Sequence, residues 1–400
     1  MSYTPSTTFN PNQFSLDAAS RLRVSSPESL GDYKEFGGTR FYQWDIEGTG
    51  VTNATGVDLY KFNMSVTPTS AWLVRQTKLY HAYFAGHSQL FEITFDNFQV
   101  EAGVNKRIGA FHSTTEVTPF SGGLDGIWLE NDGTTIKFCV YNAGVESYSK
   151  PLSGWLNAGV FSSYDWSKFT VMAIDYLWLG GGVARLWFKT ADGFVLADSY
   201  THAGQGTGTM TQFPHLPIRY DIRSTGGTGS VRAICASVAA GGGGDIVGVA
   251  LCSHTPNTGV TLPTAGVKYP LMALSKIEEF EQLPIILTDI SVFVQTITDQ
   301  VLWTLEINPV LSAPLTFTDR PNSIIREAFG DGSITVLSAG TVIAGGYSSY
   351  GQNPLPGVLD DSYFSWMGGY IDRRQDEYVL CITPLLGATT VGGTISTKTF

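Results

Sequence analysis

Short segments in which every second residue is apolar recur along the chain and predict an all-β protein. In residues 91–96 (FEITFD), Phe, Ile and Phe alternate with Glu, Thr and Asp. Residues 218–223 (IRYDIR) show the same alternation. A period of two places the apolar side chains on one face of a strand and the polar ones on the other. Both segments are therefore predicted to be half-buried strands.

Other segments rich in β-branched and aromatic residues extend this pattern over most of the chain. Asp-Gly and Gly-Gly pairs at 131–133, 180–182 and 191–193 supply the positive φ values that tight hairpins need. One helix-like stretch is residues 323–330, with Ser at a possible N-cap and Gly at its end. Further strands are expected at 78–84, 126–132, 135–142, 169–179, 183–189, 245–253, 284–298, 301–307, 333–346 and 377–385.

Two glycine-rich segments predict a division of the chain into domains. Residues 224–230 (STGGTGS) and 241–244 (GGGG) interrupt the strand pattern, which then resumes. A chain of 400 residues is also longer than one hydrophobic core usually covers. We place the boundary between 224 and 244. The expected organisation is an N-terminal arm at 1–40, a β-sandwich or jelly-roll-like domain at 41–230, and a smaller C-terminal β-rich domain at 231–400.

The composition favours a protein that assembles with others. Charged residues are only 15% of the chain, whereas aromatic residues reach 12% and there are 45 glycines. Surfaces that a partner covers are depleted in charge and enriched in aromatic residues. The net charge of −11 argues against nucleic acid and against an anionic membrane surface, since both require clustered Lys and Arg.

The four cysteines and the N-terminus predict a chain without disulfides that is made in a cytoplasm. Cys139, Cys235, Cys252 and Cys381 are scattered and form no C-x-x-C motif, so we expect buried free thiols and no metal or cofactor. The first residues show no charged and apolar leader pattern, and no apolar run approaches 18 residues. We therefore expect synthesis in a cytoplasm and no insertion into a membrane.

The motifs of common enzymes are missing from the sequence, and we predict no catalytic activity. G-x-S-x-G is absent, and the six histidines have no spacing that binds a metal. The glycines of residues 203–210 (AGQGTGTM) lack the lysine and helix of a phosphate loop. A glycosidase would need two facing carboxylates, but nothing in the sequence brings a chosen pair together. The candidate acids are Asp96, Glu130, Asp165, Asp175 and Asp221.

Aromatic residues offer an alternative, a platform on which sugar rings stack. Trp and Tyr can bury a large area against a sugar ring. Within strand patterns, however, such side chains usually belong to the core. The candidates are Trp128, Trp155, Trp166, Trp178 and Trp187.

Residues 17–34 (DAASRLRVSSPESLGDYK) do not fit the strand pattern. They are too polar for a core helix, yet their apolar residues are too regularly placed for a linker. We expect this part of the arm to dock on a neighbouring subunit, with its arginines pairing with carboxylates or carbonyls and its aliphatic residues filling a groove. The expected contact residues are Arg21, Leu22, Arg23, Val24 and Tyr33.

From this stretch to about residue 224, the sequence resembles a family of virion structural proteins from tailed bacteriophages, with relatives in some large DNA viruses. The family's N-terminal signature is similar to residues 17–34. His87 stands where the family usually has Lys, and the last 170 residues match loosely. The later motifs, in order, are VRQT (74–77), YFAGHSQ (83–89), KRIGAF (106–111), GIWLE (126–130), WLN (155–157), IDYLWLGGGV (174–183) and FPHLPIRYDI (213–222).

The resemblance implies a virion building block that is assembled in the host bacterial cytoplasm. Such a protein would act by oligomerisation and by docking on copies of itself and on other virion proteins. We expect a tail component (sheath, collar, fibre base or appendage). Three alternatives remain open: a capsid decoration protein, a receptor- or carbohydrate-binding tail protein that contacts a host-surface glycan, and a polysaccharide depolymerase.

Overall fold

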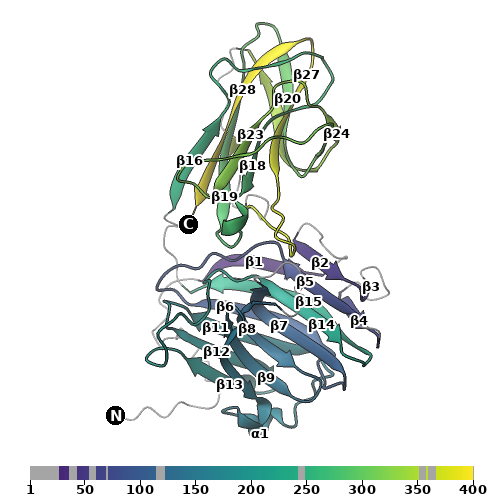
Figure 1. The fold of residues 1–400 in the computed structure, drawn as a ribbon, viewed down its shortest axis with the longest axis vertical. Coiled ribbons are helices and arrows are strands. Elements are labelled where there is room, and N and C mark those ends of the chain that lie inside the picture. Colours follow the sequence, from purple (N-terminus) through teal and green to yellow (C-terminus); the bar gives the residue numbers. More distant parts are fainter. Residues whose placement is uncertain are drawn as a thin grey trace. The chain divides into compact units, whose positions relative to one another are not determined.

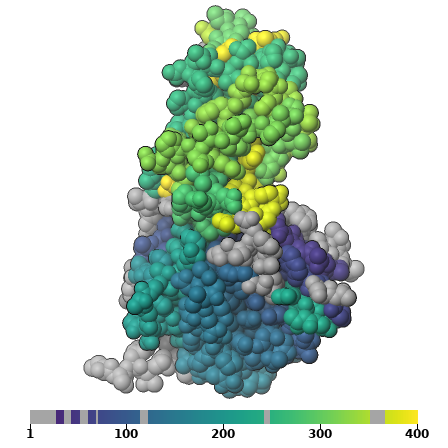
Figure 2. Space-filling model, in the orientation of Figure 1, coloured from purple at the N-terminus to yellow at the C-terminus, as the bar shows by residue number. Residues whose placement is uncertain are grey.

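The structure is a computed structural model that describes residues 27–35, 43–53, 60–68, 71–113, 122–241, 248–350, 357–358 and 366–399. It confirms the all-β prediction, because the described helical segments are short: Leu152–Gly154 (η2), Ala158–Phe161 (α1) and Glu278–Phe280 (η3). The chain forms two compact units, Met1–Asp245 and Ile246–Phe400. In Figures 1 and 2, unit 1 is coloured purple to teal and unit 2 green to yellow.

Unit 1 contains two antiparallel sheets. The eight-stranded sheet has the order β13-β12-β11-β6-β15-β4-β3, with β1 also paired to β15, and the seven-stranded sheet has the order β10-β9-β8-β7-β14-β5-β2. The strands of the eight-stranded sheet are β1 (Glu28–Lys34), β3 (Val51–Asn53), β4 (Phe62–Val66), β6 (Gln89–Asp96), β11 (Thr170–Leu177), β12 (Val183–Thr190), β13 (Gly193–Thr201) and β15 (Gly229–Ala240). Those of the seven-stranded sheet are β2 (Trp44–Gly48), β5 (Trp72–Thr77), β7 (Val104–Ser113), β8 (Leu124–Asn131), β9 (Ile136–Asn142), β10 (Val145–Pro151) and β14 (Ile218–Ser224).

The two sheets of unit 1 pack face to face as a sandwich. Phe91, Ile93 and Phe95 of β6 are fully buried, as the alternation of the sequence predicted. Contacts between the sheets include the Arg75 guanidinium, 4.4 Å from the centre of the Phe62 ring. In a sandwich, the inner face of each sheet forms the core, and the outer face is exposed to solvent or to a partner.

A polar bridge closes one side of this sandwich, between the edge strands β10 and β13. The Tyr148 hydroxyl donates a hydrogen bond of 2.7 Å to Asp198, and the Lys150 ammonium donates one of 3.1 Å to the same carboxylate. The rings of Tyr148 and Tyr200 also stack, with centres 4.8 Å apart. The fully buried Asp198 carboxylate thus accepts from a neutral hydroxyl and from a charged ammonium group. Such donors are needed because a buried carboxylate has no water to bond to.

Unit 2 is a second antiparallel β-structure with its own core. Its five-stranded sheet has the order β16-β28-β19-β26, with β17 also paired to β28, and its six-stranded sheet has the order β22-β23-β18-β27-β20-β25. Buried residues of both sheets, among them Leu287, Ile290 and Leu380, share one hydrophobic cluster. The strands are β16 (Val249–His254), β17 (Val260–Leu262), β18 (Tyr269–Lys276), β19 (Ile285–Val294), β20 (Gln300–Ile307), β21 (Val310–Leu311), β22 (Thr318–Asp319), β23 (Ile325–Phe329), β24 (Val336–Ser338), β25 (Thr341–Ser349), β26 (Gly357–Val358), β27 (Tyr378–Pro384) and β28 (Thr389–Thr399).

The structure differs from the predicted organisation at both ends of the first domain. Residues Glu28–Lys34, assigned to the arm, form β1 and pair with β15. Strand β15 itself crosses the predicted boundary at 230 and is central in the eight-stranded sheet, so unit 1 extends to Asp245. The glycines before β15 form a turn inside unit 1, and a glycine-rich segment alone does not distinguish such a turn from a linker.

Two local predictions are wrong. Residues 323–330 are not helical, since Ile325–Phe329 forms β23 and pairs with both β18 and β22. Residues 78–84 are not a strand: His81 makes only an isolated bridge to Leu216. In both cases the partners that decide the backbone conformation are distant in sequence, so a local pattern could not reveal them.

Candidate functional site

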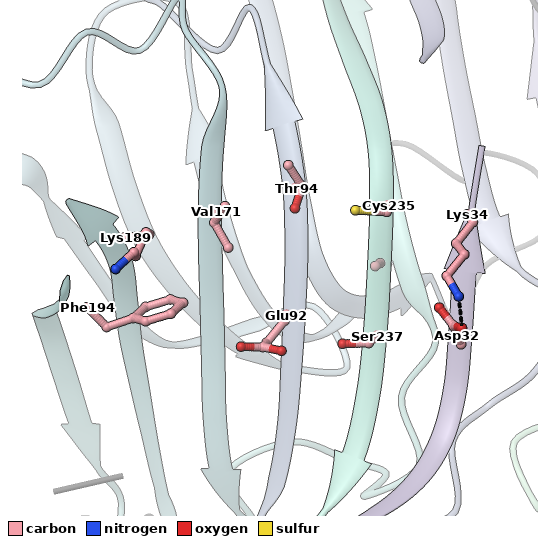
Figure 3. A pocket seen from close by; sticks show the side chains of 10 residues that line it. Asp32, Lys34, Glu92, Thr94, Val171, Lys189, Phe194, Cys235 and Ser237 are labelled. Atoms are coloured by element: carbon pink, nitrogen blue, oxygen red, sulfur yellow. Dashed lines mark hydrogen bonds and ion pairs between the residues drawn. The ribbon is translucent and has the colours of Figure 1, made fainter. Parts of the chain in front are cut away.

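The outer face of the eight-stranded sheet carries a depression of about 470 Å³. Because side chains alternate along a strand, the residues on this face are the neighbours of the core residues in the sequence. On β6, Glu92 and Thr94 point outward between the buried Phe91, Ile93 and Phe95. Figure 3 shows the labelled side chains on this face. The lining residues are Asp32, Lys34, Glu92, Thr94, Val171, Lys189, Phe194, Cys235, Ala236 and Ser237.

The lining comes from six strands that lie side by side, β13, β12, β11, β6, β15 and β1. Neighbouring strands are about 4.8 Å apart, so the five steps from β13 to β1 span about 24 Å. The depression is therefore elongated across the strands. It is long enough for a ligand made of several linked rings.

An aromatic ring and a lysine mark the β13 end of the depression. Lys189 and Phe194 are paired across β12 and β13, and the Lys189 Nζ atom lies 5.9 Å from the centre of the Phe194 ring. Lys189 is exposed and Phe194 is partly exposed. This end offers an apolar ring face next to a cationic hydrogen-bond donor.

The opposite end of the depression is polar. The Lys34 ammonium donates a hydrogen bond of 2.5 Å to Asp32, and both side chains are more than half exposed. Between the two ends, Glu92 and Ser237 lie opposite each other on β6 and β15, and Thr94 lies opposite Cys235. The lining thus combines apolar surface with hydroxyl, carboxylate and ammonium groups along its length (Figure 3), which suits a ligand that has both apolar C–H faces and hydroxyl groups.

Trp187 extends this face next to Lys189, because Arg185, Trp187 and Lys189 alternate outward along β12. The Arg185 guanidinium lies 5.9 Å from the centre of the Trp187 ring and donates a hydrogen bond of 3.0 Å to Asp175. Trp187 is half-buried. It is one of the five tryptophans that the sequence offered as a sugar platform, and it lies on the same face as the depression.

The other candidate tryptophans have different positions. Trp128, Trp155 and Trp166 are buried, as expected for core residues. Trp178 is partly buried, and its indole N–H donates to the Thr211 carbonyl in a loop of unit 1. Phe194, which the sequence analysis did not single out, supplies the ring of the depression. Its signal is weak: one aromatic residue directly after the Asp-Gly turn at 192–193.

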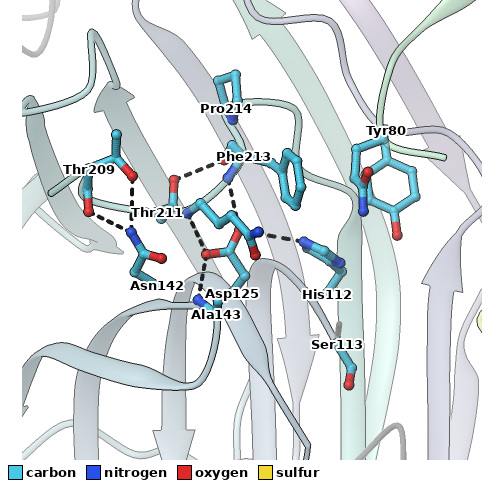
Figure 4. A network of polar contacts seen from close by, with 12 residues as sticks. Tyr80, His112, Ser113, Asp125, Asn142, Ala143, Thr209, Thr211, Phe213 and Pro214 are labelled. Atoms are coloured by element: carbon cyan, nitrogen blue, oxygen red, sulfur yellow. Dashed lines mark hydrogen bonds and ion pairs between the residues drawn. The ribbon is translucent and has the colours of Figure 1, made fainter. Parts of the chain in front are cut away.

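A buried carboxylate organises the loops at one end of the sandwich (Figure 4). Asp125 of β8 accepts hydrogen bonds from the backbone N–H groups of Ala143, Gln212 and Phe213, at 3.1, 2.6 and 3.1 Å. His112 Nε2 lies 3.5 Å from the same carboxylate. Asp125 is fully buried, so it holds these loops together and is not available to a ligand.

Asn142 fastens the same loops at a second point. Its amide donates to the carbonyl and to the hydroxyl of Thr209, at 2.7 and 3.0 Å (Figure 4). The glycine-rich segment 203–208 directly precedes Thr209 and is exposed. The glycines that were compared with a phosphate loop therefore belong to an exposed loop, and the hydrogen bonds of Asn142 to Thr209 hold the end of this loop in place.

The structure brings two of the five candidate acids together, but in a buried position. Arg107 lies between Glu130 and Asp221, with N–O distances of 3.5 and 3.8 Å. Arg219 also pairs with Asp221, at 3.3 Å. Burial raises the pKa of Asp221 to about 6. The half-buried strand predicted at 218–223 is in fact buried on both faces over most of its length, so the Asp221 side chain is fully buried and no substrate can reach it.

The remaining candidate acids are separate from one another. Asp96 pairs with Arg232 at 2.5 Å and with Lys61 at 3.3 Å. Asp175 pairs with Arg185, and Asp165 accepts hydrogen bonds from the backbone and hydroxyl of Ser167 in an exposed turn. Each of them is held by structural contacts.

The predicted assembly contacts lie in two different situations. Arg21, Leu22, Arg23 and Val24 lie outside the described residues. Tyr33 is fully buried in unit 1, where its hydroxyl contacts His81. Its prediction as a contact with another subunit is wrong, because β1 turns this side chain into the core of its own sandwich.

The cysteines also divide into two groups. All four are free; Cys139 and Cys381 are buried as predicted, whereas Cys235 and Cys252 are exposed. Both exposed thiols lie on strands, where alternation turns every second residue outward. Within the described ranges, no group of three or more His, Cys, Asp or Glu side chains is arranged to hold a metal ion. No helix among the described residues has the length and apolar character needed to cross a membrane.

No family model and no curated protein matches this sequence. Among solved structures, the carbohydrate recognition domain of Emp47p is similar at 8% identity and a TM-score of 0.36, over 54% of this chain and 97% of that one. The Ca2+/Man3GlcNAc-bound exoplasmic/lumenal domain of VIP36 is similar at 11% identity and 0.35, over 54% and 90%. A legume lectin-like domain from Entamoeba histolytica is similar at 11% and 0.34, over 54% and 98%. At these values none of them assigns a residue or a ligand to this chain.

Proposed function

We propose that unit 1 binds an oligosaccharide in the depression on the outer face of its eight-stranded sheet. The observation that carries this proposal is the Phe194 ring beside Lys189, at one end of a lining that combines polar and apolar side chains. An aromatic ring covers the apolar C–H face of a sugar, while neighbouring hydroxyl, carboxylate and ammonium groups bond to its hydroxyls. The span of about 24 Å across six strands favours a chain of sugars over a single ring.

The charge of the depression suggests which glycans it accepts. Asp32 and Lys34 neutralise each other at one end, and Glu92 balances Lys189 across the remaining length. A lining with both signs of charge has no net preference for a polyanion. The proposed ligand is therefore a neutral or zwitterionic oligosaccharide.

A glycan array probed with the full chain tests the proposal. We expect binding to neutral oligosaccharides of several units, with weaker binding to the corresponding monosaccharides. Absence of binding to every glycan on an array that includes bacterial surface polysaccharides would contradict the proposal. Release of new reducing ends from a bound polysaccharide would instead establish the depolymerase alternative.

We further propose that the protein is a structural subunit of a bacteriophage virion, and more specifically a tail component. This second proposal rests on the ordered motifs between residues 17 and 222, which resemble those of the virion family. A glycan-binding subunit on a tail would combine both functions, because tails attach to host surfaces. The test is mass spectrometry of purified virions from the source of this sequence: the chain should be present at fixed copy number relative to the major capsid protein. Its absence from intact particles would contradict a virion role.

A further inference from the structure

Strand β25 (Thr341–Ser349) is an edge of the six-stranded sheet in unit 2. It pairs with β20 on one side and with no described strand on the other. Alternate backbone N–H and C=O groups of an edge strand point away from the sheet and can pair with another strand. The nine residues TVIAGGYSS contain no charged residue and no proline, which are the usual means of blocking such an edge.

Most of the other edge strands do carry charge or are very short. Strands β10, β13 and β2 of unit 1 contain Glu or Asp, and β22 of unit 2 contains Asp319. Strands β3 and β26 have only three and two residues. Among the edges of the described sheets, only β16 and β25 are both longer than three residues and uncharged. This makes β16 a matched control for β25.

Exposed apolar side chains of unit 2 concentrate along β25 and at its two ends. Tyr347 is 74% exposed and Val342 is 51% exposed, both on β25. Of the twelve large apolar side chains that are exposed in the described part of unit 2, eight belong to this strand, to the two-stranded sheet β21-β24 and to the turns beside them. They are Ile297, Val310, Leu337, Val342, Tyr347, Tyr350, Leu385 and Leu386.

Hydrogen bonds place these residues at the ends of β25. At its end, the Tyr350 N–H donates to the Asp299 carbonyl at 3.5 Å, and the Leu386 N–H donates to the Asp299 carboxylate at 3.2 Å. At its beginning, β24 ends at Ser338, which pairs with Val310 of β21. Each end of the strand thus has its own apolar cluster.

We propose that β25 is a docking surface for a second copy of this chain, which adds its own β25 in antiparallel orientation. An antiparallel partner brings the cluster at the end of one strand onto the cluster at the beginning of the other. The same surface is then used twice around a two-fold axis. Two like-charged copies approach with least repulsion at an uncharged strip, which is why a second copy fits this edge.

The register that we propose for this pairing places the two-fold axis at Gly345, two residues after the bulge in β25. Leu305 pairs with Ala344 and Glu306 with Val342, so Ile343 is an extra residue, and Val342 and Tyr347 lie on the same face. Placing the two-fold axis at Gly345 sets Gly345 against its counterpart and the small Ala344 against Gly346. Tyr347 then lies opposite the bulge of the other copy and next to its Val342. Aromatic and β-branched residues paired in this way stabilise a sheet.

Sedimentation of the full chain over a range of concentrations tests the docking surface. We expect a concentration-dependent dimer. We expect Tyr347→Lys to weaken the dimer and to raise its dissociation constant about tenfold or more. The matched control is Val249→Lys on the edge strand β16, where the side chain is 64% exposed. This control should leave the dissociation constant unchanged. The thermal midpoint of each variant shows that unit 2 remains folded, since both side chains point to solvent.

A cross-link tests the register independently. In a background of Cys235→Ser and Cys252→Ser, Gly345→Cys should form a disulfide-linked dimer on oxidation, whereas Val249→Cys should not. A wild-type chain that stays monomeric at about 100 μM would overturn the proposal. Equal weakening by Tyr347→Lys and Val249→Lys would also overturn it, because the interface would then not be specific to β25. A dimer that does not cross-link through Gly345→Cys would overturn the proposed register.

Discussion

Tyr33 and His81 are 48 residues apart in the chain and are joined by a hydrogen bond of 2.8 Å between the Tyr hydroxyl and His Nε2. His Nδ1 lies 2.8 Å from the Leu216 carbonyl, which can only accept. Nδ1 therefore carries the proton and donates, and Nε2 accepts from Tyr33. This chain of bonds fastens β1 to the loops that follow β5 and precede β14. It explains why the last residues of the motif at 17–34 belong to the sandwich.

Tyr33→Phe should destabilise unit 1 by about 1–3 kcal/mol, because it leaves the buried His81 Nε2 without a donor. Urea denaturation of the full chain, followed by tryptophan fluorescence, measures the change. Tyr164→Phe is the control, since its hydroxyl bonds to the Lys189 carbonyl at an exposed site where water can replace it. A loss of stability no greater than that of the control would show that the bond contributes little.

His81 should make unit 1 less stable as the pH falls. Burial lowers the pKa of His81 to about 4, whereas an unfolded histidine titrates near about 6.5. Between these values the unfolded chain binds a proton that the folded chain does not. Stability from this group is therefore present above about pH 6.5 and is lost as the pH falls toward about 4, by about 3 kcal/mol in total.

Asp221 has the opposite dependence. Burial raises its pKa to about 6, above the value of about 3.9 in the unfolded chain, so its contribution decreases as the pH rises between the two. The effects of His81 and Asp221 on stability therefore oppose each other in the wild type.

His81→Gln removes the contribution of His81, and the stability difference between wild type and variant should shrink by about 2–3 kcal/mol from pH 7.5 to pH 4.5. A difference that is constant with pH would mean that His81 is not buried and neutral.

Phe194→Ala should weaken binding of an oligosaccharide about two- to tenfold, because one stacked ring contributes about 0.5–1.5 kcal/mol. The thermal midpoint should change little, since Phe194 is only partly buried. Phe169→Ala is the matched control: its ring is 60% exposed in unit 1 and does not line the depression. Titration calorimetry with the best glycan from the array measures both variants. Equal affinity of wild type and Phe194→Ala would move the binding site elsewhere.

Asp125→Asn should lower the free energy of unfolding of unit 1 by about 2–4 kcal/mol. The substitution removes a carboxylate oxygen that accepts from the Phe213 N–H and puts a donor in its place. Asp192→Asn, in the exposed turn before β13, should change stability by less than about 0.5 kcal/mol. Hydrogen exchange at residues 209–213 provides a local measurement, since these amides should lose protection in the first variant only. Unchanged exchange there would show that Asp125 does not hold the loop.

The alternation of apolar and polar residues determined much of this protein on its own. It located β6 and β14, and a richness in β-branched and aromatic residues located β8, β9, β11 and β12 in unit 1 and most of the long strands of unit 2. It also placed Trp128 in the core. The pattern assigned Glu92 to an outward face, where the structure places it in the depression.

Tertiary structure decided what local patterns do not encode. Strand β1 contains one serine and one glycine and shows little alternation, and it is a strand because β15 offers it a free edge. Asp221 alternates as an exposed acid would, yet it is buried with Arg107 and Arg219. The depression joins residues from Asp32 to Ser237, so its members meet only once six strands have paired. Alternation states which face a side chain takes, but which strands become neighbours, and what covers each face, depends on contacts between distant parts of the chain.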